Sequence, residues 1–339
     1  MAEDGRTMYQ RIVDVRVRAL VAPALTLALV AVGLLGAQPV AAAGVPVLAY
    51  GGDFPDPGIL VVGNTYYAYS TEVGSVNVPV MTSTDLTHWS AITDALKALP
   101  AWAAPGSTWA PTVLVRGGTY ALYYTTRHAY SGRQCVSVAT SASPRGPFID
   151  TSSGPLVCQF SLGGSIDPSV FTDTNATSYL LWKSDNNALG RPTTLWGQQL
   201  AANGVGFARR SQPVALLSQD AAWQAPAIEG PALMRSGSTY YLFYGANRWD
   251  SATSGIGYAT CARPLGPCTD RSTSGPWLST SAAGTPPIGP QGPSVFTDLS
   301  GVTRLAFAGW NGTVGYPNGG VRALWTAPLT FVNGQPQLG

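Results

Sequence analysis

Charged side chains are scarce in this sequence. Lys, Arg, Asp and Glu make up 11% of its 339 residues, the formal net charge is +2, and the charges form no long run or tail. Proteins that bind nucleic acid or an anionic membrane need clustered basic residues, so we expect neither partner beyond the N-terminal segment. The 15 Tyr and 10 Trp residues, with many Ser, Thr and Asn, instead suit a neutral partner rich in hydroxyl groups.

Histidine and cysteine are also rare. The two histidines lie away from the four cysteines and no Cys-x-x-Cys pair exists, which argues against a zinc site; we predict no metal site. An even number of cysteines in a secreted chain suggests two disulfides. Cys261 and Cys268 flank a short turn rich in Pro and Gly, and the pair Cys135–Cys158 follows by elimination.

Sustained helical periodicity is missing outside the first 43 residues. Arg11, Arg16 and Arg18 precede the apolar run Ala19–Ala37, and small residues lead up to Ala43, a pattern typical of a signal peptide. We therefore predict that residues 1–43 are a cleaved signal peptide and that the protein is secreted to the extracellular space. The apolar run approaches the ~20 residues that a membrane helix needs, so an uncleaved anchor is the alternative.

The rest of the chain repeats one pattern five times. Each copy has an apolar strand, a polar turn and an aromatic strand, and starts about 50 to 65 residues after the previous one, a period typical of β-propellers. A sandwich explains the strands but not their recurring start. We predict an all-β, five-bladed β-propeller over residues 44–339, a single domain and a monomer, whose last blade is completed by Val45–Tyr50. The copies begin at Asp56, Ala110, Asp167, Gly230 and Gly292.

Three of these copies begin with an acid. Asp56 and Asp167 each precede a proline, and Glu229 precedes Gly-Pro in an otherwise apolar stretch. Because the first strands of all blades line a propeller's axis, we expect these acids to meet around one pocket. The alternative is structural, since Asp-Pro and Glu-Gly-Pro are also ordinary turn sequences.

Carboxylates that share a partly dry pocket do not all ionise easily, so at least one should have a raised pKa. We assign that raised pKa to Glu229, which has no basic neighbour in the sequence. A protonated acid opposite an ionised base is what an inverting glycosidase requires. In this interpretation Glu229 protonates the leaving oxygen, Asp56 activates a water, and Asp167 orients Glu229.

At these motifs the sequence resembles glycoside hydrolase family 43, the five-bladed arabinofuranosidases, xylosidases and arabinanases. The resemblance covers the chain after residue 43 and implies the roles of base for Asp56, pKa modulator for Asp167 and acid for Glu229. The stretches that carry it are "GDFPDPGIL", "TWAPTV", "SIDPSVF", "YLLWKSD", "AIEGPALM", "YYLFYGANRW" and "GWNGTVGYPNGGVRALW".

Two stretches depart from the family's pattern. Many members carry a His near a central cation at the start of the fifth blade, where this chain has Gly292 preceded by Gln291. We therefore expect no required cofactor and no His-linked cation, although a structural cation in the channel stays an alternative. Trp310 replaces a polar residue of other members, which weakens any inference of substrate from the subfamily.

Four further residues are candidates for substrate binding. Trp109 occupies the place in its repeat that Ile166 and Ile228 hold beside the acids, where an indole stacks well on a sugar. Asn247 is placed to hydrogen-bond a hydroxyl, and Trp310 ends a fifth-blade strand. The resemblance places Arg322 beside the acids. The alternatives are core packing for the tryptophans and a surface ion pair for Arg322. Lys183 also fits the family pattern, as a residue that braces a blade.

The resemblance implies a catalytic domain that acts on plant cell-wall pentosides. We expect an α-L-arabinofuranosidase first and a β-xylosidase or an endo- or exo-α-1,5-arabinanase second, so the expected partner is an arabinose- or xylose-containing oligo- or polysaccharide. A non-catalytic carbohydrate-binding propeller would bind sugar without turnover. A protein-interaction propeller would expose an apolar patch and bind no sugar.

Overall fold

The computed structural model describes residues 44–339. The predicted signal peptide, residues 1–43, lies outside this range and stays a prediction. Within the described range every regular element is a strand or a short 3-10 helix, and none of its helices has the length and apolar character needed to cross a membrane.

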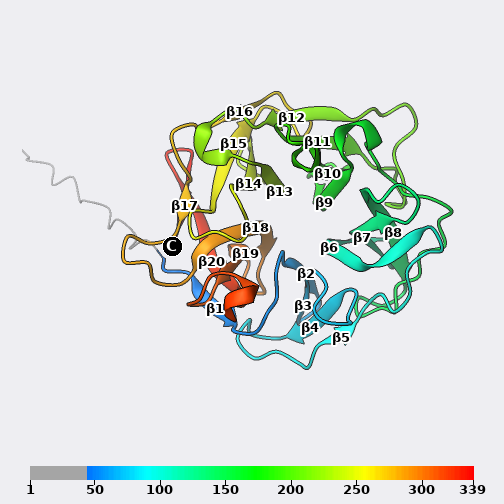
Figure 1. Cartoon of the computed structure of the whole chain (residues 1–339), viewed down its shortest axis with the longest axis horizontal. Coiled ribbons are helices and arrows are strands. Elements are labelled where there is room, and N and C mark those ends of the chain that lie inside the picture. Colours follow the sequence, from blue (N-terminus) through cyan, green and yellow to red (C-terminus); the bar gives the residue numbers. More distant parts are fainter. Residues whose placement is uncertain (1–43) are drawn as a thin grey trace, which may run out of the picture. The chain divides into compact units, whose positions relative to one another are not determined.

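Five antiparallel sheets surround one axis, as the repeats predict (Figure 1). Each sheet is one blade, and its first strand lies innermost. In chain order the blades are β2 (Gly58–Val62), β3 (Thr65–Tyr69), β4 (Pro79–Ser83) and β5 (Thr93–Asp94); β6 (Ala103–Arg116), β7 (Thr119–His128) and β8 (Gln134–Ser141); β9 (Ser165–Thr172), β10 (Ser178–Ser184), β11 (Thr194–Gln199) and β12 (Val214–Ser218); β13 (Ile228–Ser236), β14 (Thr239–Ala246), β15 (Gly255–Cys261), β16 (Cys268–Asp270) and β17 (Leu278–Ser279); and β18 (Ile288–Thr297), β19 (Thr303–Trp310), β20 (Arg322–Val332), β21 (Gln335–Leu338) and β1 (Val47–Tyr50).

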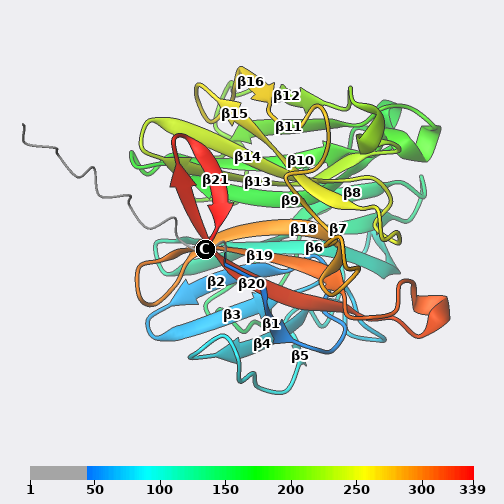
Figure 2. The same cartoon turned by 90° about the vertical axis from the view of Figure 1, so that its left-hand side faces the viewer.

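The ring is closed by its first strand. β1 pairs antiparallel with β20, with Val47 opposite Thr326, so the predicted completion of the last blade by Val45–Tyr50 is confirmed. The inner strands β2, β6, β9, β13 and β18 contact one another in cyclic order. In the side view, the 3-10 helix η4 (Tyr316–Asn318) and the hairpin of β20 and β21 lie at opposite ends of β20 (Figure 2).

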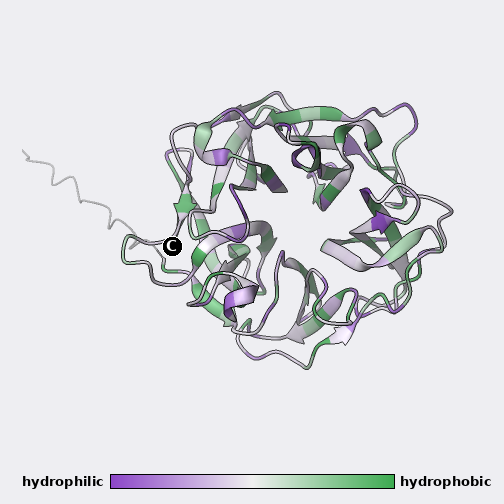
Figure 3. Ribbon diagram, in the orientation of Figure 1, coloured by the Kyte–Doolittle hydropathy of each residue, from purple (hydrophilic) through white to green (hydrophobic). Residues whose placement is uncertain are grey.

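Each blade packs on the next through its own apolar cluster. The five clusters lie between successive blades, and hydrophobic residues accordingly concentrate on the strands whereas many connecting loops are hydrophilic (Figure 3). Between blades one and two, for example, Tyr69 of β3 packs edge-on against Phe148 with 6.5 Å between ring centroids. Large aromatic pairs of this kind bury much apolar surface, which holds the inner strands at fixed positions.

Every blade has the same unusual backbone turn in or just before its inner strand. In all five blades a proline follows a residue that has a positive φ. These residues are Asp56 (51°), Ala110 (45°), Asp167 (55°), Gly230 (56°) and Gly292 (58°). This conformation is rare for a residue with a side chain. Strand pairing shifts register at this point in four blades, so in those blades the turn is a bulge that redirects the side chains beside it toward the axis.

The bulge changes the expected alignment of the repeats. Glu229 lies one residue before the positive-φ position, whereas Asp56 and Asp167 occupy it. Trp109 therefore shares its place with Ile166 and Glu229, and the expected equivalence with Ile228 is wrong. As a result Glu229 approaches the axis from a different backbone position than the two aspartates.

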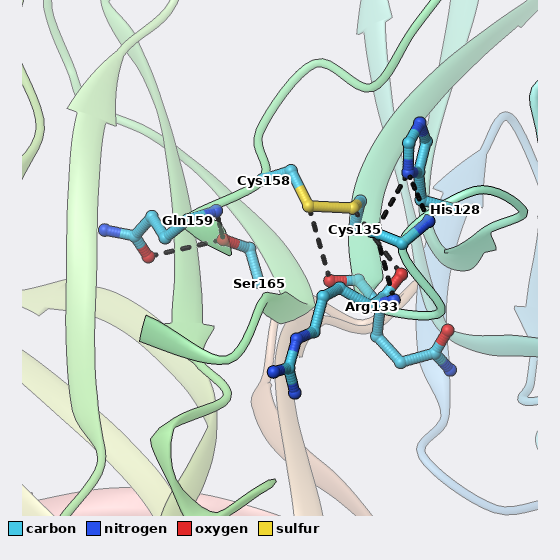
Figure 4. Close-up of a disulfide and its surroundings, with 8 residues drawn as sticks. His128, Arg133, Cys135, Cys158, Gln159 and Ser165 are labelled. Carbon is cyan, nitrogen blue, oxygen red and sulfur yellow. Dashed lines mark hydrogen bonds between the residues drawn. A yellow bond between two sulfur atoms is a disulfide. The ribbon is translucent and has the colours of Figure 1, made fainter. Parts of the chain in front are cut away.

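Both predicted disulfides form. Cys261 joins Cys268 across β15 and β16. Cys135 of β8 joins Cys158 in the loop that leads to β9 (Figure 4). In that loop the backbone N–H of Gln159 donates to Ser165 Oγ at 3.1 Å. The second disulfide thus ties blade two to the segment that carries Asp167 into the centre.

Candidate active site

A cavity of about 770 Å³ lies at the axis, where the five positive-φ turns converge. Its size falls within the usual range for small-ligand sites. Residues from all five blades line it, among them Asp53, Asp56, Thr71, Glu72, Trp109, Asp167, Lys183, Asp185, Asn187, Glu229, Trp249, Gln291, Gly292, Tyr316 and Arg322. The three acids at the starts of separate blades therefore do share one cavity.

Asp56 is held by charged and neutral donors. Arg322 donates from Nη2 to Asp56 Oδ1 at 2.7 Å and from Nη1 to Oδ2 at 3.4 Å. The hydroxyl of Thr71 donates to Oδ2 at 2.8 Å and itself accepts the N–H of Ala110 at 2.9 Å. Burial lowers the pKa of Arg322, but the charge and hydrogen bonds of Asp56 outweigh it, so the net shift is upward. These donors hold the Asp56 carboxyl in a fixed orientation.

Burial raises the pKa of Asp53 in this cavity, and the pKa of Asp167 is raised to about 8. Desolvation is the main cause, followed by the negative charge of Glu229, while Lys183 acts in the opposite direction. The N–H of Gly230 donates to Asp167 Oδ2 at 3.0 Å, which joins Asp167 to the residue next to Glu229. A raised pKa, which the sequence predicts for at least one carboxyl of this cluster, is therefore found on Asp167.

Glu229 meets a buried lysine. Lys183 Nζ donates to Glu229 Oε2 at 3.1 Å and lies 3.3 Å from Asp185 Oδ1, and the lysine side chain is only 1% exposed. Burial lowers the pKa of Lys183, but Glu229, Asp167 and Asp185 together raise it above its ordinary value. Lys183 therefore stays an ammonium ion at the centre of the acid cluster. It contacts the acids directly, whereas the sequence led us to expect only that it braces a blade.

Aromatic side chains form the wall beside Arg322. The Trp249 ring lies 5.5 Å from Arg322 Cζ, a cation–π distance, and 5.8 Å from the ring of Tyr316. Asp53 accepts the backbone N–H of Arg322 at 3.0 Å. Trp249, Tyr316 and Asp53 were not singled out from the sequence. The signal that could have found them is that they lie within the stretches "YGANRW", "GYPNGG" and "GDFPDP", respectively.

The four residues expected to bind substrate divide into two pairs. Trp109 and Arg322 line the cavity. Trp310 is completely buried and stacks beneath Trp249 with 6.3 Å between ring centroids, so it supports the wall and touches no ligand. Asn247 lies outside the cavity lining, in a turn where its Oδ1 accepts the N–H of Arg248 at 2.7 Å. For Trp310 and Asn247 the expected direct contact with sugar is therefore withdrawn.

The fifth-blade turn fits tightly against the base candidate. A Cβ added to Gly292 would lie 2.9 Å from Asp56 Oδ1, and the neighbouring Gln291 is 1% exposed with Nε2 donating to Ala246 O at 3.0 Å. In residues 44–339 no cluster of three His, Cys, Asp or Glu side chains is arranged to hold a metal ion. The arrangement is suited to proton transfer between carboxyls and a bound molecule.

The sequence is similar to several characterised proteins. The chain is 30% identical over 186 residues to the arabinoxylan arabinofuranohydrolase of Bacillus subtilis (strain 168), which covers 50% of this chain and 34% of that relative. It is 25% identical over 217 residues to the extracellular exo-α-(1→5)-L-arabinofuranosidase of Cellvibrio japonicus (strain Ueda107), covering 56% of this chain and 58% of the relative. These matches span less than two thirds of the relatives' length.

Solved structures resemble it over more of the chain. A thermostable family-43 glycoside hydrolase superposes with a TM-score of 0.74 at 25% identity, covering 84% of this chain and 92% of that one. An endo-1,4-beta-xylanase from Bacteroides thetaiotaomicron VPI-5482 gives 0.71 at 25% identity, covering 87% and 97%. Residues 44–334 match the family described as Glycosyl hydrolases family 43, and the chain therefore belongs to that family.

Proposed function

We propose that this protein hydrolyses arabinose- or xylose-containing polysaccharides with inversion at the anomeric carbon, and that α-L-arabinofuranosides are its preferred substrates. The observation that carries the proposal is the meeting of Asp56, Asp167 and Glu229 in one cavity, each from a different blade and each with distinct partners.

The partners suggest a division of labour among the acids. Asp56, which accepts hydrogen bonds from Arg322 and Thr71, is the general base that takes a proton from the attacking water. Glu229 is the general acid that gives a proton to the leaving glycosidic oxygen. Asp167, whose pKa is raised, tunes the acid and, through the N–H of Gly230, fixes the backbone beside Glu229. Both proton transfers use carboxyl groups, so the proposed chemistry requires no cofactor.

The cavity wall suits a neutral sugar. Trp109 lines one side and is partly exposed, while Trp249, which is 42% exposed, and Tyr316 line the side near Arg322. Indole and phenol rings bury apolar sugar faces, and the Arg322 guanidinium has further donors for hydroxyl groups. We assign substrate binding to these four residues.

The relatives support the choice of sugar and of location. Their names include an arabinoxylan arabinofuranohydrolase, an extracellular exo-α-(1→5)-L-arabinofuranosidase and an extracellular endo-α-(1→5)-L-arabinanase. We therefore propose a secreted enzyme, in keeping with its two disulfides. A β-xylosidase is the second candidate, favoured by a relative named as a putative beta-xylosidase. The presence of all three acids disfavours a non-catalytic binding propeller.

The test is hydrolysis of p-nitrophenyl α-L-arabinofuranoside, p-nitrophenyl β-xyloside, arabinan and arabinoxylan, with proton NMR of the first product. Release of arabinose whose initial anomer is opposite to that of the substrate would support the proposal. Faster release of xylose would name the second candidate instead. Sugar binding without turnover on all four would favour the binding propeller, and retention of configuration would contradict the assigned base.

A further inference from the structure

Lys183 is a buried cation with two carboxylate partners on different segments. It belongs to β10, whereas Glu229 begins β13 and Asp185 follows the end of β10. Its Nζ lies 3.1 Å from Glu229 and 3.3 Å from Asp185. A lysine has three donors on a flexible four-carbon chain, so a small rotation can release Glu229 and keep the contact with Asp185 without moving the backbone.

This contact conflicts with the role of Glu229 unless something changes on binding. A general acid must carry a proton when the substrate arrives, but an ammonium that donates to a carboxyl favours its ionised form. A proton is nonetheless held next to it, because desolvation and the charge of Glu229 raise the pKa of Asp167 to about 8. Asp167 is therefore the neighbouring carboxyl from which Glu229 can take the proton that hydrolysis needs.

We propose that Lys183 is a positioning residue that keeps Glu229 ionised while the cavity holds only water and turns to Asp185 when a saccharide enters. The inference rests on the proposed function, in which Glu229 is the general acid. In the exchange the Asp167 carboxyl loses its proton and the Glu229 carboxylate gains it. Lys183 remains an ammonium ion throughout, so the total charge of the site is unchanged.

The glycosidic oxygen supplies the reason for the exchange. That oxygen accepts hydrogen bonds and donates none, so it favours a protonated Glu229, as hydrogen bonding to a neutral form does in general. The groups that face Lys183 are Glu229 from β13, Asp167 from β9 and Asp185 from its own segment. Across the cavity Arg322 and Asp56 neutralise each other. Asp185 is thus the partner that can keep the ammonium stable after it leaves Glu229.

The composition of the chain makes this measurable. The full sequence contains only three glutamates, Glu3, Glu72 and Glu229. Carbon-13 NMR of protein labelled at the glutamate side-chain carboxyl will therefore show at most three signals, assigned with Glu72→Gln and Glu229→Gln. The Glu229 signal is recorded at pH 7 in the intact protein and in Lys183→Met, with Lys97→Met as control because Lys97 is the other lysine and is exposed.

We expect the intact protein and Lys97→Met to give the shift of a carboxylate for Glu229, and Lys183→Met to move that signal toward the protonated form. The saccharide arm uses Asp56→Asn, which blocks turnover, with a xylooligosaccharide bearing an arabinofuranosyl group. Saturation with this probe should move the Glu229 signal toward the protonated form while Lys183 is present. A signal that is already that of a protonated acid without sugar, or that ignores both Lys183→Met and bound sugar, would overturn the proposal.

The pH dependence of kcat/KM tests the role of Lys183 independently of the NMR experiment. The alkaline limb of kcat/KM should rise by roughly one pH unit or more in Lys183→Met, because an opposite charge at this distance shifts a carboxyl by ~1–3 units. Asp185→Asn should lower the same limb, and Lys183→Arg should keep it near that of the intact protein. If Lys183→Met and Asp185→Asn shift the alkaline limb of kcat/KM in the same direction, or if neither shifts it, the role of Lys183 is contradicted. Absence of any turnover would instead count against the proposed function, and the NMR result on the sugar-free protein would still decide the role of Lys183.

Discussion

Replacing Arg322 by Met should destabilise the protein strongly and inactivate the proposed base. The guanidinium is 7% exposed and Asp56 is 25% exposed, with two hydrogen bonds between them. Removing one partner of such a pair leaves the other buried and uncompensated, at a cost of ~3–5 kcal/mol. The backbone hydrogen bond from residue 322 to Asp53 does not involve the side chain and should survive.

Thermal unfolding followed by circular dichroism measures this cost. For a domain of this size the loss corresponds to a Tm lower by roughly 5–8 °C. Arg263→Met is the matched control, because Arg263 is exposed, and its Tm should stay within about 1 °C of the original since such surface substitutions change stability by at most ~0.5 kcal/mol.

The double variant Asp56→Asn with Arg322→Met separates the unpaired charge from lost packing. Because the asparagine carries no charge, the double variant should be more stable than Arg322→Met alone, by about 1–3 kcal/mol as neighbours in one network usually couple. If Arg322→Met unfolds at the original temperature, or if the double variant is the less stable of the two, the pair is not the buried contact described above.

Three further changes have defined outcomes. The pKa of Asp167 is raised in the folded protein to about 8, so its contribution to stability is full below the unfolded value near ~4 and is lost as pH rises through about 8; the Tm of Asp167→Asn relative to the original should therefore rise between pH 4 and pH 8.5, and an unchanged difference would contradict the shift. Thr71→Val removes a donor to Asp56; it should lower the free energy of unfolding in urea by ~1–3 kcal/mol and should also lower kcat. Thr71→Ser keeps the hydroxyl and should retain the stability and the kcat of the original protein. Gly292→Ala meets Asp56 at 2.9 Å, while Gly237→Ala has the same φ of 58° and open space; only the first should lose activity, and equal losses would show that backbone strain alone is responsible.

The architecture could be predicted from the sequence because it repeats. Five similar units, a leftover N-terminal strand and an even number of cysteines predicted the ring, its closure and both disulfides, all of which the structure contains. The convergence of Asp56, Asp167 and Glu229 followed from the same repeat, because equivalent positions of a propeller meet at its axis.

The remaining contacts lie between blades, where the sequence holds no local signal. Lys183 and Glu229 are 46 residues apart and Arg322 and Asp56 are 266 apart, so neither partner is evident from its neighbours. The burial of Trp310 depends on Trp249 covering it. The raised pKa of Asp167 arises from burial and from surrounding charges, which only the assembled cavity supplies.

The central claim is that Glu229 delivers a proton to the leaving oxygen, and Glu229→Gln tests it most directly. The measurement is kcat/KM of the intact protein and the variant on arabinoxylan and on an aryl α-L-arabinofuranoside whose leaving group needs no proton. General acid catalysis contributes ~10²–10⁴-fold, so we predict a loss of about that size on arabinoxylan and a much smaller loss on the aryl substrate. Equal losses on both substrates, or full activity of the variant on arabinoxylan, would contradict the account.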